Sequence, residues 1–199
     1  MKATRLEAYS DAVIAIVITI MVLELHVPAE ASLAALAEIL PTFLAYVLSF
    51  IYLSIYWNNH HHLLHASDRV NGRVMWANIH LLFWLSLVPF STAWLSQNPG
   101  TALTSAVYGL NLFMVGLAYF LLVRSLKACH APDSRLNQLT ASAVKENAST
   151  LLYLMGIGAS LLGWVAVAYA IYVLVALMWV IPDRRYEALI QAEMARSRK

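Results

Sequence analysis

Residues 8–25 read AYSDAVIAIVITIMVLEL, in which every residue from Ala12 to Leu23 is apolar except Thr19. A helix that crosses a lipid bilayer needs roughly 20 consecutive, mostly apolar residues. This stretch therefore predicts a membrane-spanning helix close to the start of the sequence. Three further stretches have a similar length and character: 40–57, 74–95 and 102–122.

The last apolar block, residues 148–181, is too long for one span and long enough for two short ones. Glycine weakens helices and permits unusual backbone angles, so a turn near Gly156, Gly158 or Gly163 would divide the block. A five-span alternative would leave the two termini on opposite sides of the membrane. We expect six transmembrane helices, at about 5–26, 38–60, 72–96, 101–127, 140–160 and 163–181.

The composition indicates an all-α, polytopic integral membrane protein. Of the 199 residues, 61% are hydrophobic and 12% are charged, whereas soluble domains have about 45–50% apolar and about 25% charged residues. Such a chain is stable where its outer surface meets lipid. Residues 1–182 are expected to form one six-helix domain, followed by a basic cytosolic tail at 183–199.

The positions of the basic residues favour the six-span count. With six spans, all 13 Lys and Arg residues fall on one side of the membrane, and the positive-inside rule makes that side the cytoplasm. Both termini are then cytoplasmic, whereas five spans would place the basic C-terminal tail outside. The basic residues are Lys2, Arg5, Arg69, Arg73, Arg124, Lys127, Arg135, Lys145, Arg184, Arg185, Arg196, Arg198 and Lys199.

Several function classes have no support in the sequence. The basic residues are scattered over short loops, which argues against nucleic-acid binding. Cys129 is the only cysteine, so an internal disulfide and a cysteine-based metal site are excluded. We found no catalytic constellation and predict no cofactor.

The first helix carries the most informative polar residues. Asp11 is followed at once by apolar residues, and a carboxylate there is costly unless it is paired or solvated, which makes it a candidate for a functional site. Further along, Ile16, Ile20 and Leu23 share one helical face, with Thr19 beside them. On the residues alone, a lipid-facing or core stripe, with the Thr19 hydroxyl bonded back to its own helix, is the more common explanation of such a face.

Four histidines, His60, His61, His62 and His65, lie at the end of the second predicted helix. Histidine is a common metal ligand, and His61 and His65 share a face. Adjacent histidines point in different directions, however, and no carboxylate or cysteine joins them in the sequence. No metal site is therefore predicted.

Residues 5–11, with the pattern Arg-x-x-x-aromatic-Ser-Asp, resemble the signature of the transmembrane protein 175 family. These proteins are potassium channels of endosomes and lysosomes, with shorter prokaryotic relatives. The family has Phe where this sequence has Tyr9. Other similar stretches lie along the rest of the sequence: Trp57-Asn58-Asn59-His60-His61, Asn78, Pro89-Phe90-Ser91-Thr92, Trp179 and Pro182.

The resemblance implies a potassium-permeable cation channel in the plasma membrane of a prokaryote, with one six-span unit per chain and four chains in a homotetramer. In the family the first helix lines the pore, and no pore loop is present. This sequence agrees in lacking a Thr-Val-Gly-Tyr-Gly filter segment. By residue match the hydrophobic constriction falls on Ile16, with Ile20 and Leu23 further along, and the pore threonine falls on Thr19.

The resemblance also implies a hydrogen-bonded network at the cytosolic mouth. Its members would be Arg5, Ser10 and Asp11 on the first helix, His60 or His61 on the second, and Asn78 on the third. The main alternative function is a secondary transporter of a small solute. Transporters usually need polar groups near the midplane and broken helices, and midplane charges are absent here. The expected partners are the lipid bilayer, further copies of the chain, K⁺ and other monovalent cations.

Overall fold

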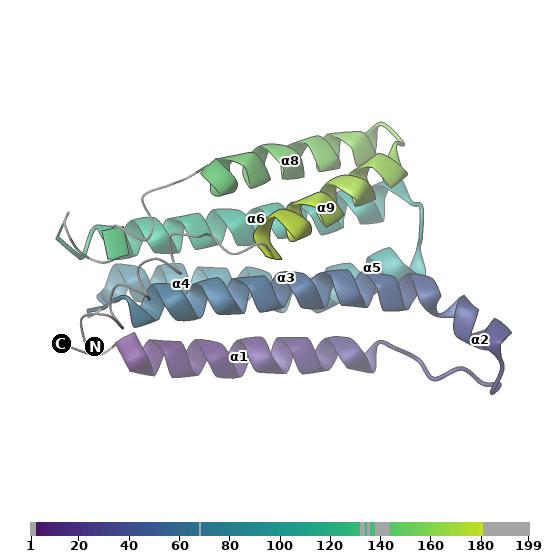
Figure 1. Cartoon of the computed structure of the whole chain (residues 1–199), viewed down its shortest axis with the longest axis horizontal. Helices are drawn as coiled ribbons and strands as arrows, with labels where there is room; N and C mark the ends of the chain where they lie inside the picture. The colour runs from purple at the N-terminus through teal and green to yellow at the C-terminus, as the bar shows by residue number, and fades with distance from the viewer. Residues whose placement is uncertain (1–2, 68, 132–133, 135, 138–143, 181–199) are drawn as a thin grey trace, which may run out of the picture.

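The computed structural model describes residues 3–67, 69–131, 134, 136–137 and 144–180, and these residues contain helices but no strand. The predicted tail at 183–199, Lys2 and Arg135 lie outside the described residues. The long helices run side by side with alternating direction (Figure 1). They are α1 (Ala3–Leu23), α2 (Leu33–Glu38), α3 (Leu40–His65), α4 (Gly72–Ser86), α5 (Val88–Gln97), α6 (Ala102–Lys127), α8 (Val144–Leu161) and α9 (Val165–Val180).

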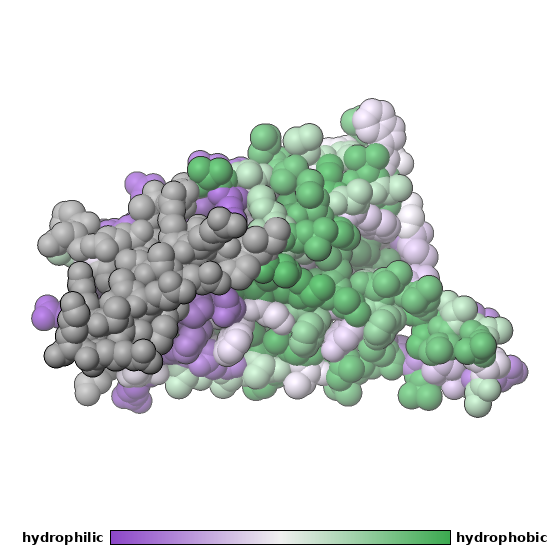
Figure 2. All heavy atoms as spheres, viewed as in Figure 1, coloured by the Kyte–Doolittle hydropathy of each residue, from purple (hydrophilic) through white to green (hydrophobic). Residues whose placement is uncertain are grey.

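Four helical stretches of the described chain are long and apolar enough to cross a membrane, judged by length and composition. They are Ala3–Leu23, Leu40–His65, Gly72–Gln97 and Ala102–Lys127. The described side chains on one face of the molecule agree in part (Figure 2). Hydrophobic residues dominate its middle, hydrophilic residues gather toward the end where α1 begins, and the end that carries α2 shows both kinds. This distribution suits a protein whose middle meets hydrocarbon and whose ends meet water.

The first connection contains a short helix, α2, that the sequence did not predict. Ser32 caps its N-terminus, because the Ser32 hydroxyl accepts a hydrogen bond from the backbone N–H of Ala35 at 3.1 Å. None of its side chains is buried, so the apolar periodicity that reveals longer helices gives little signal here.

The third predicted span is one stretch with a break in the middle. α4 ends at Ser86 and α5 begins at Val88, with Pro89 in its first turn. Proline lacks an N–H group and its ring clashes with the preceding turn, so a helix kinks or ends just before it. The Asn111 side chain of α6 donates to the carbonyl of Trp84 at 3.4 Å beside the break.

The last apolar block folds as the hairpin of α8 and α9. The turn lies at Gly163, whose φ of +83° is in the left-handed region that favours glycine, whereas Gly156 and Gly158 lie within α8. α9 is apolar but has only 16 residues, and α8 is not among the four candidate spans. The six-span count therefore stays a prediction for these two helices.

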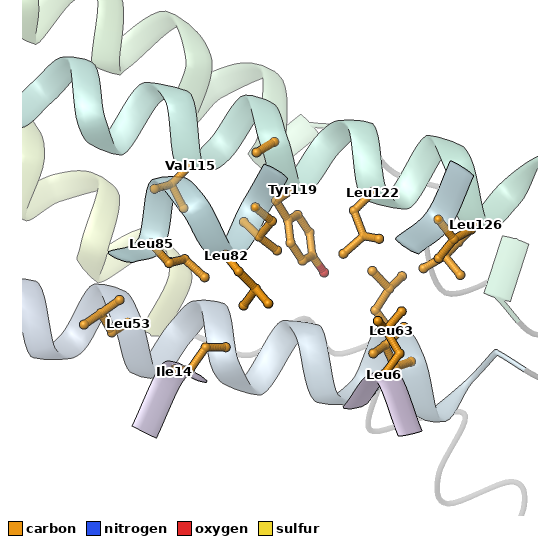
Figure 3. Close-up of a cluster of buried hydrophobic side chains, with 14 of the residues drawn as sticks. Leu6, Ile14, Leu53, Leu63, Leu82, Leu85, Val115, Tyr119, Leu122 and Leu126 are labelled. Carbon is orange, nitrogen blue, oxygen red and sulfur yellow. The ribbon is translucent and has the colours of Figure 1, made fainter. Parts of the chain in front are cut away.

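Two buried clusters hold the bundle together. The first joins α1, α3, α4 and α6, and Figure 3 shows its leucine, isoleucine and valine side chains pointing toward one another around Tyr119. The second joins α3, α5, α6, α8 and α9 around Tyr172, which is fully buried. One face of α1 is thus anchored in the core, and this anchoring fixes which face points outward.

Candidate functional site

The two faces of α1 have opposite environments although both are largely apolar. One face packs into the bundle through Ala3, Leu6, Ser10, Ile14, Val17 and Met21, all of which are buried. On the other face Ile16 is 57% exposed, Ile20 is 45% exposed and Leu23 is 77% exposed. The four residues predicted to line a pore, these three and Thr19, therefore lie together on the outer face of α1 in the single chain.

The Thr19 hydroxyl donates a hydrogen bond to the carbonyl oxygen of Ile16 at 2.9 Å. Its single hydrogen is thereby engaged within the helix, and a hydroxyl has two acceptor lone pairs besides. Because Thr19 is exposed, the oxygen presents those lone pairs to whatever faces this side of α1. That arrangement is suited to contact with a cation.

An open groove runs between α1 and α5, with a volume of about 710 Å³. Ile16 and Ile20 line its α1 side, and Phe90 and Trp94 line its α5 side. Phe90 is 62% exposed, so the groove adds apolar surface beside the outer face of α1. Glu24 lines the groove one residue beyond the end of α1.

At the other end of α1, the structure brings Ser10, His60 and Asn78 together in a buried chain of hydrogen bonds. Ser10 Oγ donates to the carbonyl of Leu6 at 2.8 Å, and Asn78 Nδ2 donates to Ser10 Oγ at 2.9 Å. Asn78 Oδ1 lies 2.7 Å from His60 Nε2. Because this amide oxygen can only accept, His60 Nε2 carries the proton in this bond. The chain joins α3, α4 and α1.

The His60 ring is fully buried, and its second nitrogen, Nδ1, makes no hydrogen bond in the structure. The imidazole is therefore held through Asn78 alone. This makes Asn78 the centre of the chain, because it contacts both other helices at once.

Two further side-chain bonds tie α1 to α3 beside this chain. Trp57 Nε1 donates to Asp11 Oδ1 at 3.0 Å, so the Asp11 carboxylate has a hydrogen-bond partner. One turn earlier on α1, Glu7 Oε1 lies 2.8 Å from Nδ1 of His61. Arg5 is exposed, and no hydrogen bond or ion pair to a described residue is assigned to it.

The sequence did not single out Glu7, and it gave no reason to pair Trp57 with Asp11. A signal was available, because Glu7 and Asp11 are four residues apart, as are Trp57 and His61, so each pair shares a helical face. Which face of one helix meets which face of the other depends on packing, which the sequence pattern does not specify.

The model of the family "Endosomal/lysosomal potassium channel TMEM175" matches residues 5–89, which run from α1 into the start of α5. A potassium channel of Chryseobacterium sp. strain P1-3 is 49% identical over 187 residues, which cover 94% of this chain and 97% of the relative. A potassium channel of Streptomyces collinus is 32% identical over 153 residues, covering 72% and 74% of the two chains.

The chain is also similar to a solved structure, the crystal structure of a lysosomal potassium-selective channel TMEM175 homologue from Chamaesiphon minutus. Its TM-score is 0.76 at 25% sequence identity, with 89% of this chain and 96% of that chain covered. The matched proteins are helical membrane proteins of a potassium channel class, which are not enzymes. The chain belongs to the TMEM175 family.

Proposed function

We propose that this protein is a potassium-permeable cation channel of a prokaryotic plasma membrane, in which α1 helices from four copies surround the pore. The observation that carries the proposal is the outer face of α1, where Ile16, Ile20 and Leu23 are exposed while the opposite face is buried. The names of the matched relatives support potassium as the permeant ion.

Ile16 and Ile20 form the hydrophobic constriction in this proposal, with Leu23 further along the same face. A ring of four isoleucine side chains closes a pore by excluding water, and a small rotation or outward shift of the helices opens it again. Thr19 lies between them in the sequence, and its outward lone pairs replace part of the hydration shell of a passing cation. Glu24 beyond one end of α1 raises the local cation concentration.

The groove between α1 and α5 supports the homotetramer. It lies beside the pore face, and exposed apolar side chains such as Phe90 line it. A neighbouring copy that packs here would cover this surface and hold its own α1 at the axis. The lipid bilayer covers the remaining apolar surface of the assembly.

The hairpin of α8 and α9 supplies the fifth and sixth spans in the same proposal, so that both termini are cytoplasmic. The packing of α8 against α6 and α9 supports a hairpin that lies within the depth of the bundle. The positive-inside rule then accounts for every basic residue of the chain.

A secondary transporter is the alternative, and one structural feature bears on it. The break between α4 and α5 is a discontinuity within a span, as transporters often have. The residues beside it are Ser, Thr, Pro and apolar residues, with no charged group. Single-channel current steps after reconstitution would identify a channel, because a carrier moves ions too slowly to give them.

The constriction is tested by replacing Ile16 with Asn and recording currents in planar bilayers. An amide at this position keeps the ring wetted, so Ile16→Asn should pass a larger leak current than the wild type at every voltage. Val22→Asn is the matched control, because Val22 is 44% exposed on the same helix but lies off the proposed pore face.

Equal currents from the wild type and Ile16→Asn would rule out Ile16 as the constriction. A similar leak in Val22→Asn would show that any polar residue on α1 disturbs the assembly. A reversal potential that follows the chloride gradient would contradict cation permeation altogether.

A further inference from the structure

The end of α3 bears two histidines, His61 and His65, on one face of the helix. Their rings are stacked, with centroids 5.9 Å apart and planes 15° apart. His65 is exposed and the His61 side chain is 41% exposed, so both rings are accessible from solvent. Neither ring takes part in the buried chain that contains His60.

The fold supplies the carboxylate that the sequence did not place beside these histidines. Glu7 of α1 lies 2.8 Å from His61 Nδ1. A carboxylate oxygen can only accept, so Nδ1 carries the proton and the neutral imidazole keeps its lone pair on Nε2. A carboxylate bound to one ring nitrogen while the other is left free is the arrangement that orients histidines which ligate metals.

We propose that His61 and His65 form a binding site for a divalent transition metal of the zinc, nickel and copper class, oriented by Glu7. Imidazole is a preferred ligand of these metals. The exposed His65 side chain is free to rotate until its nitrogen and His61 Nε2 reach one ion. No group of three or more His, Cys, Asp or Glu in the described chain is placed to hold a metal, so water completes the coordination.

Charge at this position favours the ion. His65 lies in the last turn of α3 and His61 directly before that turn. The negative end of the helix dipole stabilises a cation there, and the Glu7 carboxylate is adjacent. Since Glu7 belongs to α1, a bound metal also strengthens the tie between α3 and α1. The binding itself does not depend on the proposed pore, and it is measured without any current.

The test titrates Cu²⁺ into the purified full chain, with affinity tags removed, and follows electron paramagnetic resonance. The wild type should show one saturable site per chain with two coordinated nitrogens. His65→Ala is the main variant, because an exposed side chain can be removed without loss of packing. It should lose the second nitrogen. The Cu²⁺ affinity of Glu7→Gln should fall about tenfold, which is typical when a metal ligand loses the group that orients it. The affinity of His65→Ala should fall further.

His62→Ala is the matched control. His62 is in the same run, with its ring centroid 5.6 Å from that of His61 but its plane turned by 61°, so this variant should bind Cu²⁺ like the wild type. The proposal is overturned if His65→Ala binds as the wild type does, if His62→Ala loses as much affinity as His65→Ala, or if no saturable site exists. Currents in planar bilayers report on the pore separately, so the two proposals can fail independently.

Discussion

At the scale of single residues, hydrogen bonds join the buried side chains of His60, Asn78 and Ser10. Buried polar groups cost free energy unless they are hydrogen-bonded, and here three helices each contribute one of them. These buried hydrogen bonds therefore specify how α1, α3 and α4 pack, because a shift of any one helix breaks at least one of them.

Removal of the central amide should consequently be expensive. Asn78→Ala leaves the His60 Nε2–H and one Ser10 lone pair without partners in a buried place. We expect the free energy of unfolding to fall by about 1–3 kcal/mol, measured as a lower midpoint of thermal unfolding in detergent. Asn58→Ala, at an exposed position of α3, is the control and should leave the midpoint unchanged. Equal midpoints for both variants would show that the hydrogen bonds of Asn78 do not hold the helices together.

At the scale of helices, close approach around Tyr172 organises the second half of the bundle. The Tyr172 ring of α9 lies against Gly109 of α6 and Gly156 of α8. A Cβ atom on Gly156 would come within 2.5 Å of the ring, and one on Gly109 would overlap the hydroxyl end. The Tyr172 hydroxyl donates to the carbonyl of Ser105 at 3.1 Å, which holds the ring in this position.

Two glycines of α8 make a matched pair for testing this packing. Gly156→Ala should lower the free energy of unfolding by about 1–3 kcal/mol, because the added methyl group forces the Tyr172 ring to shift. Gly158→Ala meets nothing within 4 Å, and alanine is the better helix former by about 1 kcal/mol, so it should be neutral or stabilising. Thermal unfolding of both variants measures the difference. The reverse order would mean that α9 does not pack as described.

At the scale of the whole molecule, the count and direction of the spans set the sidedness of every loop. The α5–α6 connection and the α8–α9 turn lie at one end of the bundle, and α6 ends at the other (Figure 1). Asn98 directly follows α5, Leu162 directly follows α8, and Ala131 lies beyond the end of α6. Six spans place Asn98 and Leu162 outside the cell and Ala131 inside. Five spans would instead bury Leu162 near the middle of the bilayer.

Labelling with a membrane-impermeant maleimide distinguishes these models. In a Cys129→Ala background, Asn98→Cys and Leu162→Cys should react in intact cells, whereas Ala131→Cys should react only after the membrane is opened. All three residues are exposed in the structure, so the three cysteines are comparable probes. A Leu162→Cys variant that stays unlabelled in intact cells, while Asn98→Cys reacts, would favour five spans.

The sequence predicts the long helices well because a bilayer requires long apolar runs, and α1, α3, α6 and the stretch Gly72–Gln97 follow those runs. We did not expect α2, which buries no side chain. We also did not expect the break at Pro89, although a proline inside an apolar run favours one. For the candidate site, the face of α1 follows from helical periodicity. The pairing of Glu7 with His61 depends on the rotation of two helices about their axes, which no local pattern encodes.

The buried chain of hydrogen bonds has a single direction, from the imidazole of His60 through Asn78 and Ser10 to the Leu6 carbonyl. An asparagine is the one side chain of its shape that accepts at one end and donates at the other. An ionised aspartate would place a second acceptor against Ser10, whose hydroxyl hydrogen is already bonded to the Leu6 carbonyl. A leucine would offer neither a donor nor an acceptor. The two neighbours of position 78 therefore require a side chain that both accepts and donates a hydrogen bond. Few amino acids other than asparagine meet this requirement, although Asn78 is fully buried.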